Sequence, residues 1–141
     1  MDKFDHHILA LLRQDARQPI SRIAEQVNLS RPAVSERIQR LEHSGVIRGY
    51  HADVAPTATQ PVKAFFELFH QQGQCALYAK QLGAFPEVRH CYGISGETDM
   101  LIQVEAESIE RIQQLLQAIE RLPGIRRIRT HVVMRDWPLG S

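Results

Sequence analysis

The sequence predicts an α+β protein with an N-terminal helix-turn-helix domain, winged or purely three-helical, and a C-terminal ferredoxin-like βαββαβ domain. Three short segments before residue 45 carry apolar residues at helical spacing. After residue 61 the patterns run strand, helix, strand, strand, helix, strand, the order of two βαβ halves joined by a hairpin. A Pro/Thr-rich stretch separates these regions. We therefore expect a DNA-binding type of domain over residues 1–50, a strand and linker over residues 51–61, and the ferredoxin-like domain over residues 62–141.

Capping and turn residues define three N-terminal helices. Asp2 can cap the first, which is expected to end before Pro19. Asn28 suits a tight turn, and Ser30 can cap a third helix with Pro32 in its first turn, where the missing N–H costs nothing. The apolar positions are Phe4, Ile8, Leu11 and Leu12, then Ile23, Ala24 and Val27, then Val34, Ile38 and Leu41. The alternating pattern that follows predicts a strand over residues 46–54.

The second and third helices have the layout of a helix-turn-helix, in which the second helix of the motif enters the major groove of DNA. Arginine can pair with guanine, glutamine with adenine, and serine with either bases or backbone. The candidate DNA-binding residues are Ser30, Arg31, Ser35, Arg37, Gln39 and Arg40. Two alternatives stay open: the arginines can form a solvated helix face, and Arg37 can equally form a structural ion pair with an acidic residue.

The C-terminal pattern places both helices on one face of an antiparallel sheet. Strands are expected over residues 62–70, 88–95, 100–106 and 125–134, and helices over residues 74–82 and from Ser108 to Pro123. In the first strand, Phe65 and Phe69 alternate with Phe66 and Leu68, so large apolar groups point to both faces. Since exposed apolar surface of this kind usually marks an interface, we expect dimerisation through the sheet.

The ordered parts and their motifs resemble the Lrp/AsnC family, the feast/famine regulators of bacteria and archaea. The resemblance covers nearly the whole chain. Its motifs are Asp5 and Ile8-Leu9, then Leu29-Ser30, Val34, Arg37, Leu41, Glu42, Gly45-Val46-Ile47 and Tyr50, then Pro86-Glu87-Val88, Tyr92, Gly96, Asp99 and Pro123-Gly124-Ile125. The resemblance implies a transcription regulator that binds double-stranded DNA as a homodimer, often assembled into an octamer, and that responds to a small effector such as an amino acid.

The resemblance also implies that the hairpin turn lines the effector pocket of an effector-binding and oligomerisation domain. The candidate effector-binding residues are Ser95, Gly96, Glu97, Thr98 and Asp99. Backbone N–H groups and a carboxylate in such a loop suit the charged ends of an amino acid, and Asp99 could accept the ammonium group. The alternative is that Asp99 only fixes a turn that needs glycine for its backbone angles.

Other classes of function find little support. The formal net charge of +1 is uninformative. The two isolated cysteines and the seven histidines without metal-ligand spacing predict no disulfide framework and no metal site, and we expect no cofactor. The sequence has no membrane-length apolar run and no signal peptide, which favours the cytoplasm. We expect no enzyme. The alternatives weighed are a sirohaem decarboxylase-like enzyme, disfavoured by the Gly/Asp hairpin turn, and an architectural DNA binder without an effector.

Overall fold

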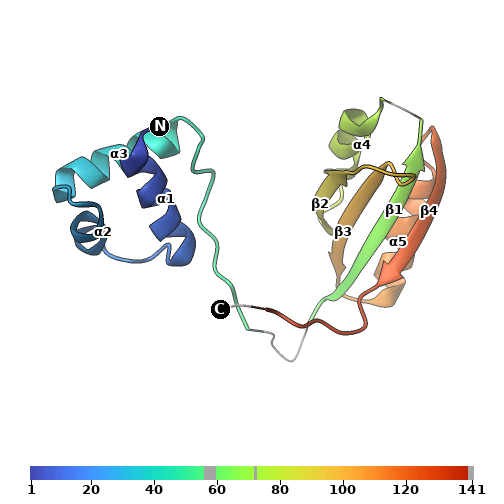
Figure 1. Cartoon of the computed structure of the whole chain (residues 1–141). Helices are drawn as coiled ribbons and strands as arrows, with labels where there is room; N and C mark the ends of the chain where they lie inside the picture. Colours follow the sequence, from blue (N-terminus) through green and yellow to red (C-terminus); the bar gives the residue numbers. More distant parts are fainter. Residues whose placement is uncertain (56–59, 72, 140–141) are drawn as a thin grey trace. The chain divides into compact units, whose positions relative to one another are not determined.

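The computed structural model describes residues 1–55, 60–71 and 73–139 (Figure 1). The chain divides into two compact units, Met1–Ala55 and Pro56–Ser141. Each unit has its own hydrophobic core. Residues 56–59 of the expected linker lie outside the described residues.

The N-terminal unit contains three helices, α1 (Lys3–Gln14), α2 (Ile20–Val27) and α3 (Arg31–His43), as the sequence predicts. The Asp2 carboxylate accepts hydrogen bonds from the backbone N–H groups of Phe4 and Asp5, which completes a capping box at the start of α1. Asn28 takes a left-handed conformation, with φ of 56°, and makes the tight turn between α2 and α3. The shared core consists of Ile8, Leu11, Ile23, Ala24, Val27 and Val34.

The predicted strand over residues 46–54 is wrong. After α3 the chain runs without strand structure as far as Ala55, so the domain is three-helical rather than winged. Val46, Tyr50 and Val54, the residues that would alternate along the strand, are all exposed. A strand is stabilised by backbone hydrogen bonds to a neighbour, and within the described residues of this unit no other strand is present to supply them.

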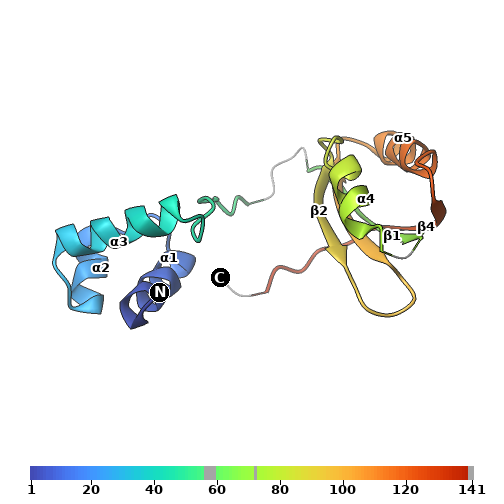
Figure 2. The same cartoon turned by 90° about the horizontal axis from the view of Figure 1, so that it is seen from above.

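The C-terminal unit has the predicted βαββαβ order: β1 (Val62–His70), α4 (Cys75–Leu82), β2 (Val88–Gly93), β3 (Met100–Ala106), α5 (Ile109–Glu120) and β4 (Ile125–Val132). The antiparallel sheet has the strand order β2-β3-β1-β4. Figures 1 and 2 show the sheet with its two helices. Both helices contribute to one core with one face of the sheet, so they cover the same side.

The first strand presents apolar residues to both faces of the sheet, as predicted. Phe66 and Leu68 are fully buried under the helices, whereas Phe65 and Phe69 lie half-buried on the opposite face. We call this second face the open face. Phe69 lies under a guanidinium there, with the Cζ of Arg127 4.3 Å from its ring centroid.

Candidate DNA-binding helix and effector turn

Helix α3 packs one side and exposes the other. Val34 is buried in the core shared with α1 and α2, and Leu41 is buried as well, which fixes the rotation of the helix. Arg31, Gln39 and Arg40 are exposed, and Ser35 is half-buried between the two sides. The four therefore lie along the side of α3 that the unit leaves uncovered.

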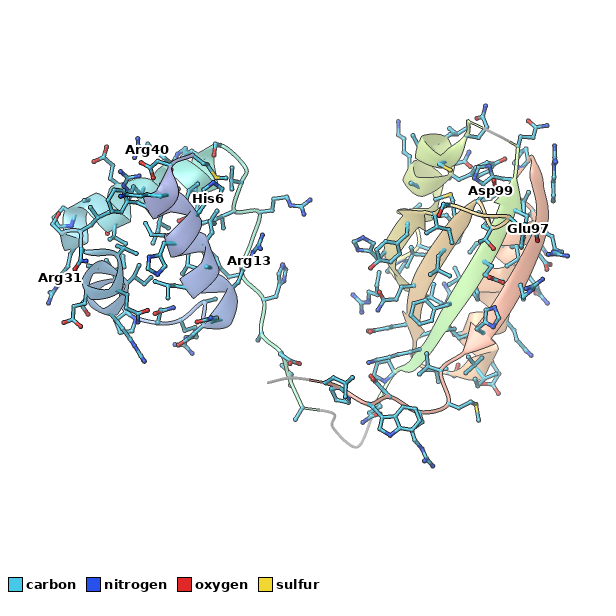
Figure 3. All side chains as sticks on the ribbon, viewed as in Figure 1. His6, Arg13, Arg31, Arg40, Glu97 and Asp99 are labelled. Atoms are coloured by element: carbon cyan, nitrogen blue, oxygen red, sulfur yellow. The ribbon has the colours of Figure 1, made fainter. Side chains whose placement is uncertain are left out.

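Arg31 and Arg40 occupy opposite ends of this exposed surface. Figure 3 labels both on α3, with Arg13 on α1 for comparison. Nine residues of α-helix separate their Cα atoms by about 14 Å along the axis and by about half a turn around it, so the two side chains flank the exposed surface of α3. In the described part of the chain neither side chain forms an ion pair, so both guanidinium groups are available to phosphate or bases.

Two other candidate residues, one just before α3 and one on it, form contacts within the N-terminal unit. The Ser30 hydroxyl accepts a hydrogen bond from the backbone N–H of Ala33 at 3.3 Å, so it caps the helix. Arg37 lies on the packed side and bridges the Asp2 and Asp5 carboxylates at 2.8 and 3.0 Å. These carboxylates raise the pKa of the Arg37 guanidinium, which is already charged at every physiological pH. The geometry thus favours the ion pair for Arg37.

The β2–β3 turn is attached to the end of β1 by hydrogen bonds from both its backbone and its side chains. The backbone N–H of Asp99 donates to the Leu68 carbonyl at 3.1 Å. In return, the backbone N–H of His70 donates to Oδ2 of Asp99 at 2.9 Å. Gly96 has a φ of 101°, which glycine adopts without strain, so the turn needs a glycine at this position.

Most residues of the turn are accessible to solvent. Ser95, Gly96 and Glu97 are exposed, while Thr98 is half-buried. Figure 3 shows Glu97 and Asp99 together on this turn at one end of the sheet. For Asp99, Oδ2 is the oxygen with a hydrogen-bond partner among the described residues, which leaves Oδ1 available to a ligand.

One charged cluster at the turn was not anticipated from the sequence. The Thr98 hydroxyl donates to Oε1 of Glu67 at 3.3 Å, and Oε2 of Glu67 lies 3.2 Å from His131 and 3.4 Å from Arg129. The hydrogen bond from His131, followed by the charge of Arg129, lowers the pKa of the Glu67 carboxyl. Glu67 pairs with Arg129 in the β1–β4 register, so only the strand register brings these residues together.

The structure places no group of three or more His, Cys, Asp or Glu side chains as metal ligands within residues 1–55, 60–71 and 73–139. No described helix has the length and apolar character needed to cross a membrane.

A helix-turn-helix unit and a separate ferredoxin-like unit in one chain are the parts expected of a transcriptional regulator. The sequence matches the family models for the AsnC-type helix-turn-helix domain over residues 1–42 and for the Lrp/AsnC ligand binding domain over residues 63–137. The chain belongs to the Lrp/AsnC family.

Individual relatives agree with this assignment. Transcriptional regulatory protein DoeX of Halomonas elongata is 36% identical over 141 residues, covering 96% of this chain and 89% of the relative. The crystal structure of the leucine response regulatory protein LrpA of Mycobacterium tuberculosis is 28% identical, with a TM-score of 0.84, covering 98% of this chain and 95% of that one. A transcriptional regulator from Neisseria meningitidis, solved in complex with L-Met, is 26% identical, with a TM-score of 0.78 and coverage of 96% and 91%.

The matching relatives are regulators of transcription and not enzymes, which excludes the sirohaem decarboxylase reading. The ferredoxin-like unit is a ligand-binding domain of this family, attached to a DNA-binding domain.

Proposed function

We propose that this regulator reads double-stranded DNA in the cytoplasm through the exposed side of α3. The observation that carries this proposal is the availability of the Arg31 and Arg40 guanidinium groups at the two edges of the exposed surface of α3, whose remaining surface packs through Val34 and Leu41. Ser35 and Gln39 lie between them and can contact base edges or phosphates. Ser30 contributes by fixing the start of the helix, and Arg37 by holding the helix against α1.

Replacement of Arg40 tests the proposed DNA contact. Arg40→Ala should weaken operator binding by about 1–3 kcal/mol and change the preference at one base position if the guanidinium reads a base. A phosphate contact would instead weaken binding to all sequences alike and reduce the salt slope by about one unit. The measurement is a titration of DNA, selected from random sequence or from the promoter of the protein's own gene, at several salt concentrations.

Arg13→Ala provides the matched control because Arg13 is exposed on α1 rather than on α3. It should leave affinity and salt dependence close to those of the unmodified protein. Equal affinities and equal salt slopes for all three proteins would remove Arg40 from the DNA interface.

We further propose that the turn of residues 95–99 binds an amino acid as the effector. The complex of the Neisseria meningitidis relative with L-Met supports an amino acid as the class of ligand. In this chain the exposed turn offers backbone N–H groups for a carboxylate and Oδ1 of Asp99 for an ammonium group.

Two substitutions of Asp99 separate ligand binding from the support of the turn. Asp99→Asn keeps an oxygen that can accept the His70 N–H but removes the charge, so the apo melting temperature should stay close to normal while stabilisation by the amino acid is lost. Asp99→Ala removes both, so it should also lower the apo melting temperature. The measurement is a set of melting curves across the twenty amino acids.

If an amino acid still raises the melting temperature of Asp99→Asn, the amino acid binds at another site. If no amino acid shifts the melting temperature of the unmodified protein, the effector proposal fails and the architectural reading of the DNA-binding protein takes its place.

The proposed assembly is a homodimer through the open face of the sheet, with an octamer as the higher form. Phe65 and Phe69 on β1 and Tyr92 on β2 give this face its apolar character, and Tyr92 is exposed. Burying such a patch against a second copy would remove it from water.

A further inference from the structure

A histidine and a cysteine form a close pair beside the turn. His70 ends β1 and is 3% exposed, and its Nε2 lies 3.3 Å from Sγ of Cys75, the first residue of α4. The other ring nitrogen, Nδ1, is within hydrogen-bond distance of the Gln71 backbone carbonyl. Since a carbonyl only accepts, Nδ1 carries the hydrogen, and Nε2 of the neutral ring is the acceptor for the Cys75 thiol.

Two contacts hold the imidazole ring in this orientation, and a third holds the backbone of His70. Its own backbone N–H is bound by the Asp99 carboxylate at 2.9 Å. The ring of Tyr78 packs on it with 4.6 Å between centroids, and the Gln71 carbonyl fixes the tautomer. A histidine that serves only to fill the core needs no such alignment of its free nitrogen with a sulfur.

We propose that Cys75 is a modification site for small disulfides, with His70 as the base that accepts the thiol proton. In the reaction Nε2 of His70 takes the proton as Sγ attacks one sulfur of the disulfide. The S–S bond of the reagent breaks, a new S–S bond joins Cys75 to half of the reagent, and the other half leaves as a thiolate with the electron pair. His70 then releases the proton to that thiolate or, where the leaving thiol is strongly acidic, to water.

The local environment of Cys75 favours this reaction further. Cys75 is partly exposed at the edge of the core, and the reaction requires that a small reagent reach its Sγ. It also lies in the first turn of an eight-residue helix, where the peptide dipoles favour a negative sulfur. Cys91 on β2 is also partly exposed but is a contrast, because burial raises the pKa of its thiol.

Modification of Cys75 would change the contacts of the β2–β3 turn. The Cys75 thiol lies 3.9 Å from the Asp99 carbonyl, and the Asp99 carboxylate holds the His70 backbone. A group attached to Sγ must displace at least the first of these contacts. Oxidation of Cys75 would therefore change the structure of the turn even when no amino acid is bound.

Single-cysteine variants of the full-length protein test the proposal. Cys91→Ser leaves Cys75, and Cys75→Ser leaves Cys91 as a matched thiol of similar exposure. With dithiobis-nitrobenzoate, whose leaving thiolate absorbs visible light, Cys75 should react about tenfold faster or more than Cys91 in the folded protein. In denaturant the two rates should converge. Equal rates in the folded state would overturn the proposal.

Replacing the histidine distinguishes base catalysis from simple exposure. His70→Asn in the Cys91→Ser background keeps an N–H donor for the Gln71 carbonyl but removes the base, so the rate should fall by about tenfold. His90→Asn, at an exposed histidine stacked on Tyr92, is the control and should have no effect. An unchanged rate in His70→Asn would refute the role of His70, and His70→Gln offers a second replacement if the first does not fold.

Discussion

Arg37 links the first and third helices of the N-terminal unit through two carboxylates. Its guanidinium contacts Asp2 and Asp5, and it also lies 5.2 Å from the ring centroid of Phe4. Asp2 at the same time caps α1. A single side chain on α3 is thus connected to the capping group of α1, which sets the position of the recognition helix against the helix before the motif.

Removal of this link should lower stability in a pH-dependent way. The backbone N–H of Asp5 and then the Arg37 guanidinium lower the pKa of the Asp2 carboxyl. A carboxyl with a lowered folded-state pKa contributes stability above its unfolded pKa, about 4, and loses it as the pH falls through the folded pKa. Arg37→Met should therefore lower the melting temperature at pH 6–7, and its difference from the unmodified protein should shrink in acid.

Melting curves from neutral pH down to about pH 2 would check this, a range set by the usual acid titration of proteins. Arg40→Met is the control, because Arg40 has no ion pair within the described residues. A difference between Arg37→Met and the unmodified protein that does not depend on pH would show that packing on Phe4, rather than the ion pair, carries the effect.

At the scale of elements, helix α4 is connected to the turn between α5 and β4. The Tyr78 hydroxyl of α4 donates a hydrogen bond to the Pro123 carbonyl at 2.6 Å. The next residue, Gly124, has a φ of 85°, and a Cβ at this position would overlap the Tyr78 hydroxyl. Glycine is therefore required here for both its backbone conformation and its small size.

Gly124→Ala should destabilise the C-terminal unit by roughly 1–3 kcal/mol. The control is Gly96→Ala, because Gly96 also has a positive φ but has open space around the Cβ position. Gly96→Ala should lower the free energy of unfolding by less, because it introduces backbone strain without a steric overlap. Denaturant unfolding of the two variants measures the difference, and equal losses would show that the Tyr78 overlap relaxes without cost.

Hydrophobic periodicity was sufficient to predict the order of the helices and sheet strands, and it is clearest in β1 and β3, which bury every second residue. The same reasoning failed for residues 46–54, whose alternating pattern has no neighbouring strand to bind. Periodicity also placed the exposed side of α3. It could not give the β1–β4 register or the ring orientation of His70, so the clusters around Glu67 and Cys75 appear only in the structure.

For the whole molecule, the two units have separate cores, and the proposed dimer surface lies within the second. Deletion of residues 1–60 should therefore leave a folded domain that is at least dimeric. Sedimentation at micromolar concentration measures this. Phe65→Glu in the same fragment should give a folded monomer, because it places a charge in the open face. A stable monomer without that substitution would move the dimer contacts to residues 1–60.

The hydrogen bond between Thr98 and Glu67 joins the proposed effector turn to the open face of the sheet. Glu67 lies beside Arg129 and His131 on that face, so the turn is connected to the charged groups of the proposed dimer surface. If binding at the turn changes the affinity at the open face through this hydrogen bond, the linkage is reciprocal. If the amino acid strengthens dimerisation by some factor, dimerisation must strengthen amino-acid binding by that same factor. The apparent affinity for the effector would then depend on protein concentration.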